Sequence, residues 1–452
     1  MKISKISLNN YRGFKELKLN LHPKLTVIVG VNGCGKTTIV SSIKLLLWSY
    51  IRNFKQDLRR GSIPSIKPDD VYHSLSQGKK HIRHYPCSVR GKLDFSEGDG
   101  FDHFNFDDEF DEEFEFDLVG CELKSANSKA RWLEGSFANM EAASKRMDIA
   151  FEDLDRIQGR TDEFTPLPLV ACYGTSRLWR RSAGDRNINR TTSRFAGYDG
   201  AVSGTSNFLK FEWFIFYLVR HVNKEKAAQL FMGVLESIES ISGWAMKVPM
   251  PGEEDLIFSR QNETMKLSQL GDGVRCMIGL AGDLACRCAM LNMSKGKDSV
   301  RSAVGVVLID EIDLHLHPAW QQTILSDFQK AFPRLQFIVT THSPQVLSTV
   351  HKENVRIFER TNAGDIVVSL PIGQTYGEPS GDVLHNVMMV DPQPPVQEKI
   401  ELQLLTELID NGRYDEPDTI ELTSKLTLAL GEQHPQLLKL RRSITRQRMF
   451  SK

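Results

Sequence analysis

Residues 24–50, KLTVIVGVNGCGKTTIVSSIKLLLWSY, decide the fold of this chain. The apolar run 25–29 predicts a buried strand, and the apolar periodicity that resumes after Gly35 predicts a helix. Between them, residues 30–37 read GVNGCGKT, which is a complete G-x-x-x-x-G-K-[ST] phosphate loop. In such a loop, backbone N–H groups surround phosphate oxygens, and the positive end of the following helix points at the same place. The strand–loop–helix context therefore predicts a nucleotide site rather than a chance glycine turn.

The residue types of this loop predict ATP and Mg²⁺ as ligands. Lys36 supplies a mobile cation for the β- and γ-phosphates, and the Thr37 hydroxyl suits a Mg²⁺ ligand. The other predicted nucleotide contacts of this segment are Asn32, Gly33, Gly35 and Thr38. Arg12 lies in the turn between two segments, 2–9 and 16–21, whose alternating pattern predicts half-buried strands. It is either a nucleotide contact or a solvated turn residue.

A second polar group follows the apolar run 304–309, which predicts a fully buried parallel strand. Asp310 and Glu311 come directly after that run, and carboxylates at the carboxyl end of such a strand face the ligand crevice of an open α/β sheet. We expect Asp310 to hold Mg²⁺ through water, and Glu311 to orient and deprotonate the attacking water. His342, which follows the last predicted core strand, is expected to sense or position the γ-phosphate.

Two further polar segments lie in the second half of the chain. Residues 267–275, LSQLGDGVR, form a glycine-rich turn ahead of an apolar helix that runs to residue 291. A glycine turn at a helix start is another candidate anion site. His315 and His317 alternate as metal ligands can, but no third ligand lies nearby in the sequence, so we reject a metal site there.

Composition bounds the class of protein. The 452 residues allow about three domain-sized units and a large core. Lys+Arg and Asp+Glu both number 57, so the overall charge does not predict nucleic-acid binding. No apolar run reaches the ~18 residues of a membrane span, and the N-terminus has no signal-peptide core. Seven scattered cysteines without C-x-x-C spacing predict reduced thiols in a cytoplasmic protein with no membrane partner.

The middle and the end of the chain carry charge runs that allow more than one interpretation. An insertion at about 52–165 contains an acidic loop, 94–117, with twelve acidic residues and no Lys or Arg; it is either a solvated loop or a DNA-mimicking arm. A helix is predicted at 136–158, and a helical region at about 206–266, with one amphipathic helical stretch at 208–241 and a hairpin of short strands at 244–266. The tract of Arg177, Arg180, Arg181, Arg186, Arg190 and Arg194 contacts phosphate, DNA or a second subunit, or is a solvated loop.

In order and context, these motifs resemble the ABC-type ATPase heads of the SMC/RecF class. The matching segments are NYRGF (10–14), the phosphate loop, VVLIDEIDLHLHPAWQQ (306–322) and FIVTTHSPQVL (337–347). The resemblance implies an α/β fold with a mixed sheet over residues 1–375, interrupted by the insertion, and a helical partner-binding region at 376–452. It also implies that two subunits clamp ATP between one phosphate loop and the partner's signature turn.

By that resemblance, Glu311 is the catalytic carboxylate, His342 is the switch histidine, and Asp313 lies in the loop that crosses the dimer interface. The signature turn departs from the family pattern Leu-Ser-x-Gly. Gly271 stands where the serine donates to the γ-phosphate, whereas Gly273 keeps the family glycine. This departure leaves open a nucleotide-sensing scaffold with little turnover.

A narrower resemblance is to the PtuA group of ATPases, found in Septu anti-phage systems and in some retrons. It rests on LPLVACYGTSR (167–177), TYGE (375–378), VLH (383–385) and DPQPPV (391–396). Members of this group are accompanied by an HNH nuclease, PtuB. The resemblance implies an ATP-hydrolysing head that dimerises or oligomerises and controls a separate nuclease, since the chain itself has no HNH pattern. A RecF-like DNA-repair ATPase that contacts DNA directly is the alternative.

Overall fold

The computed structural model describes residues 1–52, 64–75, 81–94, 119–132, 167–175, 194–204, 208–221, 225–249, 255–361 and 364–450. The predicted acidic loop after residue 94, the helix expected at 136–158 and the arginines from 177 to 190 lie outside these ranges. Within them the chain forms two compact units, Met1–Met388 and Met389–Lys452. Each unit is described by itself.

A six-stranded sheet is the centre of the first unit, in the order β16-β15-β3-β14-β13-β9. Its strands are β3 (Leu25–Gly30), β9 (Leu169–Tyr173), β13 (Gly305–Ile309), β14 (Leu335–Thr340), β15 (Val355–Arg360) and β16 (Ile366–Ser369). All neighbours are parallel except β15 and β16, which are antiparallel. The α/β fold with a mixed sheet is therefore confirmed. Because β3, β13 and β14 are parallel neighbours, the segments that follow them start at one edge of the sheet.

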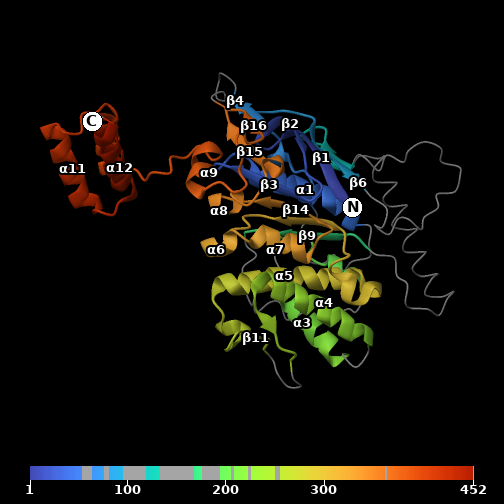
Figure 1. Ribbon diagram of the computed structural model, residues 1–452. Coiled ribbons are helices and arrows are strands. Elements are labelled where there is room, and N and C mark those ends of the chain that lie inside the picture. Colours follow the sequence, from blue (N-terminus) through green and yellow to red (C-terminus); the bar gives the residue numbers. More distant parts are fainter. Residues whose placement is uncertain are drawn as a thin grey trace, which may run out of the picture. The chain divides into compact units, whose positions relative to one another are not determined.

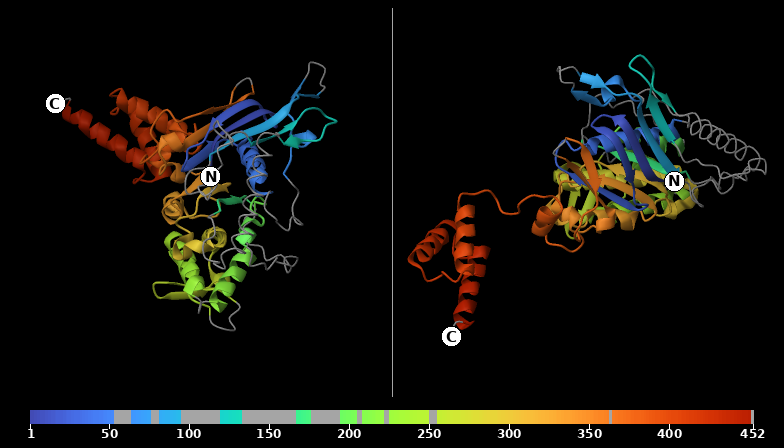
Figure 2. Two further views of the ribbon diagram at one scale, coloured as in Figure 1. Left: turned by 90° about the vertical axis from the view of Figure 1, so that its right-hand side faces the viewer. Right: turned by 90° about the horizontal axis from the view of Figure 1, so that it is seen from above.

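A second, antiparallel sheet has the order β2-β1-β6-β7-β8. Its strands are β1 (Lys2–Tyr11), β2 (Phe14–Asn20), β6 (Cys87–Asp94), β7 (Val119–Leu123) and β8 (Arg131–Trp132). Helix α1 (Lys36–Ile51) lies between the two sheets and contacts strands of both (Figure 1; Figure 2). A Cβ atom at Gly91 would lie 2.4 Å from Leu46 Cδ1, so β6 approaches this helix closely. Apolar residues on all sides of α1 fit this burial.

Helices cover the other face of the parallel sheet, where α5 (Asp272–Leu291) contacts β9 (Figure 1). The apolar stretch 208–241 was expected to be one helical stretch; it forms two helices, α3 (Phe208–Arg220) and α4 (Glu225–Ser242). The hairpin expected at 244–266 is a small antiparallel sheet of β10 (Ala245–Met246), β11 (Ile257–Arg260) and β12 (Glu263–Lys266).

Shorter elements connect the main ones. They are η1 (Pro68–Asp70), β4 (His73–Leu75), β5 (His81–Arg83), η2 (Arg194–Tyr198), η3 (Leu267–Gln269), η4 (Met293–Ser299), α6 (Pro318–Gln321), α7 (Ile324–Ala331), α8 (Pro344–Leu347), η5 (Lys352–Asn354) and α9 (Ser380–Asn386). Pro318 occupies the first turn of α6, as its sequence position predicts.

The second unit consists of α10 (Glu398–Asp410), α11 (Pro417–Leu430) and α12 (Pro435–Phe450). A small core of its own holds these helices together, formed by Leu402, Leu405, Ile409, Leu426, Leu437 and Leu440. Among the described residues of both units, no helix combines the length and the apolar character that crossing a membrane requires.

Candidate nucleotide site

The phosphate loop has a backbone that only glycine accommodates easily. Gly33 and Gly35 have φ angles of +83° and +86°, in the left-handed region that side chains rarely adopt. A Cβ atom at Gly35 would lie 2.6 Å from the Phe14 ring. At Gly30 it would lie 2.4 Å from the Phe358 carbonyl oxygen of the neighbouring strand β15. Backbone conformation and close neighbours therefore require glycine at these positions of the loop.

Lys36 begins α1 and reaches back over this loop. Its Nζ donates to the carbonyl oxygens of Gly30 at 2.7 Å and Val31 at 3.1 Å. Burial lowers the pKa of Lys36, and nearby Cys34, Asp310 and Glu311 oppose that shift. The two carboxylates that the sequence assigned to the same site thus lie within electrostatic reach of the lysine.

Thr340, at the end of β14, orients Asp310 and Glu311. Its hydroxyl donates to Asp310 Oδ1 at 2.6 Å and accepts a bond from the Glu311 backbone N–H at 2.7 Å. The Asp310 N–H in turn donates to the carbonyl oxygen of Tyr173, at the end of β9, at 2.8 Å. Glu311 has a φ of +50°, in the left-handed region. These bonds fix the Asp310 carboxylate and the Glu311 backbone at the end of β13.

The segments after β13 and β14 are bonded to each other. The Thr341 hydroxyl donates to Asp313 Oδ1 at 2.6 Å, and the His342 backbone N–H lies 3.4 Å from the same oxygen. The Ser343 hydroxyl donates to Gln321 Oε1 at 2.6 Å. His342 and Asp313 are therefore brought together at the edge where the phosphate loop also begins.

Arg12 lies over the first turns of α1. Its Nε donates to Asp70 Oδ1 at 2.8 Å, and its Nη1 donates to the Ser41 hydroxyl at 3.1 Å. Ser41 follows Thr37 by about one helical turn, and its hydroxyl donates to the Thr37 carbonyl oxygen at 2.8 Å. Arg12 is thus an anchored side chain beside the phosphate loop.

Sequence reasoning missed several residues of this region. Arg360, on β15, donates through Nη2 to the carbonyl oxygen of Gly33 at 3.3 Å. Asp70 and Thr340 also went unassigned. The contacts of Arg360 and Asp70 join segments far apart in the chain, so local pattern carries no signal for them. For Thr340 a signal existed, because two adjacent threonines end a buried strand beside the predicted carboxylates.

The glycine turn at the start of α5 lies against the segment after β13, at His315 and Trp320. Gly271 is the residue before the helix, with a φ of −62°. A Cβ atom at Gly273 would lie 2.7 Å from the His315 carbonyl oxygen and 3.3 Å from the Trp320 ring. The turn therefore packs on the segment that follows Asp313.

The donor set at the sheet edge fits Mg²⁺ rather than a metal held by protein ligands alone. Mg²⁺ is usually bound through one or two carboxylates, with substrate phosphates and water completing its shell. Asp310 and the Thr37 hydroxyl are donors of this kind. Across the described ranges, no cluster of three or more His, Cys, Asp or Glu side chains is arranged to hold a metal. His317 Nδ1 accepts a bond from the Ala319 N–H at the start of α6.

Comparisons with known proteins match most of this chain to ATPases and to one domain family. A family model described as "AAA domain, putative AbiEii toxin, Type IV TA system" matches residues 25–348. The chain is 26% identical to the retron Vc95 probable ATPase of Vibrio cholerae serotype O1 biovar El Tor, over 93% of this chain and 86% of that protein. It is 24% identical to the retron Ec83 probable ATPase of Escherichia coli, over 98% and 86%. With the Septu protein PtuA of Bacillus thuringiensis it shares 23% identity over 97% of each chain.

Proposed function

The chain belongs to this AAA domain family, and on that premise we propose that it is the ATPase subunit of an anti-phage defence complex that oligomerises and controls an HNH nuclease partner. It is a P-loop ATPase of the SMC/RecF-like class, similar to Septu PtuA and to retron ATPases. The observation that carries the proposal is the common sheet edge of the phosphate loop, Asp310, Glu311 and His342. That edge supports ATP hydrolysis as the activity through which a separate nuclease is controlled.

Each side chain has a proposed task in hydrolysis. The Lys36 ammonium exchanges its bonds to the loop carbonyls for bonds to the β- and γ-phosphates of ATP. Thr37 and Asp310 would hold Mg²⁺, which supplies charge neutralisation at the phosphates when bound. Glu311 orients a water molecule and accepts its proton while the water oxygen bonds to the γ-phosphorus. The bond from that phosphorus to the β–γ bridging oxygen breaks, and ADP leaves. His342 contacts the γ-phosphate.

We propose that two heads enclose ATP between them. One copy supplies the phosphate loop, with Asn32, Thr38 and Arg12 as further contacts, and the other supplies the turn of Gly271 and Gly273 together with Asp313. The bond from Thr341 to Asp313, and the packing of Gly273 on the following segment, support a single interface surface built from both elements. ATP that binds only the assembled form shifts the chain toward assembly by its difference in affinity for the two states. Nucleotide state is thereby coupled to the nuclease.

The helical region 376–452 is the proposed site for the nuclease partner. Large apolar side chains are exposed on its helices: Ile400, Leu404, Ile420, Leu428 and Met449. A groove of about 580 Å³ on α12 is lined by Leu438, Arg441, Arg442, Thr445, Arg446 and Met449. Apolar surface combined with clustered arginines suits an acidic partner or a nucleic-acid backbone. We place the complex in the cytoplasm, because all seven cysteines are free thiols.

Phosphate release by the wild type and by Glu311→Gln tests the chemistry. The amide keeps the shape of the side chain but cannot accept the proton, so we expect turnover to fall by about 10²- to 10⁴-fold. Glu263→Gln is the matched control, since Glu263 is exposed on β12, and it should keep the wild-type rate. Equal rates for Glu311→Gln and the wild type would remove Glu311 from its role. Co-purification with an HNH nuclease encoded in the neighbouring reading frame tests the partner.

A further inference from the structure

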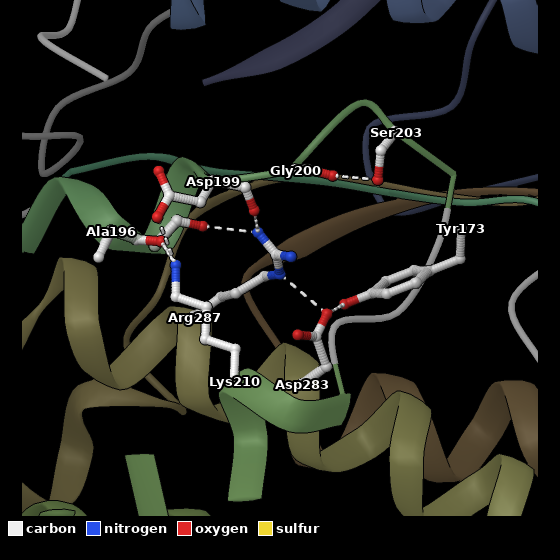
Figure 3. A network of polar contacts seen from close by, with 9 residues as sticks. Tyr173, Ala196, Asp199, Gly200, Ser203, Lys210, Asp283 and Arg287 are labelled. Atoms are coloured by element: carbon white, nitrogen blue, oxygen red, sulfur yellow. Dashed lines mark hydrogen bonds and ion pairs between the residues drawn. The ribbon is translucent and has the colours of Figure 1, made fainter. Parts of the chain in front are cut away.

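A buried polar cluster joins β9 to α5, as Figure 3 shows. The Tyr173 hydroxyl and Arg287 Nε both donate to Asp283 Oδ2, each at 2.8 Å. Asp283 is 2% exposed and Arg287 is 3% exposed, so water does not share these bonds. Burial raises the pKa of Tyr173 well above its ordinary value, which keeps the hydroxyl protonated as a donor. Two residues of α5 are thus bonded to each other and to one strand.

The same arginine holds the turn that precedes α3. Arg287 Nη1 donates to the carbonyl oxygens of Gly197 at 2.8 Å and Asp199 at 3.0 Å. On the other side of the turn, Lys210 Nζ donates to Asp199 Oδ2 at 2.9 Å and to the Ala196 carbonyl oxygen (Figure 3). Both buried charged side chains of α5, Asp283 and Arg287, therefore have directional partners.

Tyr173 connects this cluster to the nucleotide site. It is the last residue of β9 and pairs in register with Ile309, the last residue of β13. Its carbonyl oxygen accepts the bond from the Asp310 N–H, while its hydroxyl bonds to α5. Tyr173 thus links Asp310, at the edge of the sheet, to Asp283 on α5, the helix that begins after Gly271.

Stability alone does not account for such a cluster. Replacing a buried ion pair with apolar residues of similar volume is often neutral or stabilising, whereas directional bonds specify one geometry. We infer that Tyr173, Asp283 and Arg287 are positioning residues, which fix α5 and the glycine turn at its start to the sheet edge that carries Asp310 and Glu311. This inference rests on the proposed function, in which that turn acts on the ATP of a second copy.

Two matched tyrosine variants of the full chain test the inference. Tyr173→Phe removes only the hydroxyl that reaches Asp283. Tyr198→Phe removes an equally buried hydroxyl that donates to the Pro168 carbonyl oxygen at 2.7 Å and lies 3.3 Å from the Tyr50 hydroxyl. It leaves in place the Gly197 and Asp199 carbonyl oxygens that Arg287 binds, and so controls for a lost buried hydrogen bond. Amide hydrogen exchange at residues 271–275, kcat and the Kd for ATP are measured for both, together with Tm. If Tyr173→Phe does not fold, Asp283→Asn tests the same oxygen.

We expect Tyr173→Phe to speed exchange at the start of α5 and to lower kcat by about 2- to 30-fold, with the Kd for ATP unchanged within about twofold. Tyr198→Phe should lower Tm to a similar extent and change neither exchange at α5 nor kcat. Equal exchange at residues 271–275 in the two variants would overturn the inference, as would a wild-type kcat in Tyr173→Phe. Equal phosphate release by the wild type and Glu311→Gln would instead contradict the proposed function. Amide exchange at residues 271–275 would still test whether Tyr173 fixes the start of α5.

Discussion

The phosphate loop and the glycine turn before α5 both open a helix, but their glycines stand under different constraints. Gly35 has a φ of +86°, and a Cβ atom there would lie 2.6 Å from the Phe14 ring. Gly271 has an ordinary φ of −62°, and a Cβ atom there would meet nothing within 4 Å. The fold therefore requires glycine at position 35 but not at position 271. Serine, which the Leu-Ser-x-Gly pattern has at this position, would therefore fit at residue 271 without a clash.

The strongest test of this comparison is the same substitution in both turns. Gly35→Ala forces a side chain into a left-handed backbone against an aromatic ring, so we expect the free loop to relax to another conformation. Restoring the phosphate-binding conformation against strain of about 1–3 kcal/mol corresponds to about a 5- to 150-fold weaker ATP affinity. Gly271→Ala should leave ATP affinity at the wild-type value. Titration with a fluorescent ATP analogue measures both. If the two variants bind ATP equally well, the phosphate loop is not constrained as its geometry indicates.

The second test concerns the bonds from Thr340 to the Asp310 carboxylate and to the Glu311 backbone, on the phosphate-loop side of the comparison. Thr340→Val keeps the shape of a fully buried side chain but removes the hydroxyl between Asp310 and the Glu311 N–H. Because a misplaced reacting group costs up to about 10²-fold, we expect turnover to fall by about 10- to 100-fold, measured as phosphate release at saturating ATP and Mg²⁺.

Thr349→Val is the control for this change, since the partly buried Thr349 hydroxyl donates to the Val346 carbonyl oxygen of α8 and, among the described residues, makes no bond to Asp310 or Glu311. It should retain turnover. A similar loss in both variants would show that the deficit follows from general destabilisation and not from the carboxylates.

The elements of the nucleotide site were predictable because each has a local pattern. The apolar runs before Gly30 and Asp310 predicted the buried strands, and the glycine spacing predicted the phosphate loop. The partners that hold the site were not predictable, since Arg12 bonds to Asp70 and Arg360 to Gly33 across long stretches of chain. Periodicity also merged α3 and α4 into one stretch, because both are amphipathic and only a short segment separates them.

The third test is a substitution in the turn before α5, and its expected effect on turnover is the smallest. Gly271→Ser adds the hydroxyl that the family pattern has at this position, and the open space around Gly271 accepts it without strain. Serine is also a slightly better residue than glycine before a helix, by a few tenths of a kcal/mol, so Tm should rise a little. If the turn faces the γ-phosphate in an assembled pair, one hydrogen bond made in the transition state raises kcat by about 2- to 13-fold.

Gly271→Ala separates the hydroxyl from the added carbon in that measurement. The gain should appear only with serine, and it should grow with protein concentration, because the turn and the phosphate loop belong to different copies. Equal kcat for the serine and alanine variants at every concentration would mean that the turn does not reach the phosphate. In that case the open surroundings of Gly271 would be those of an ordinary helix start, and the two glycine turns would differ in function as well as in constraint.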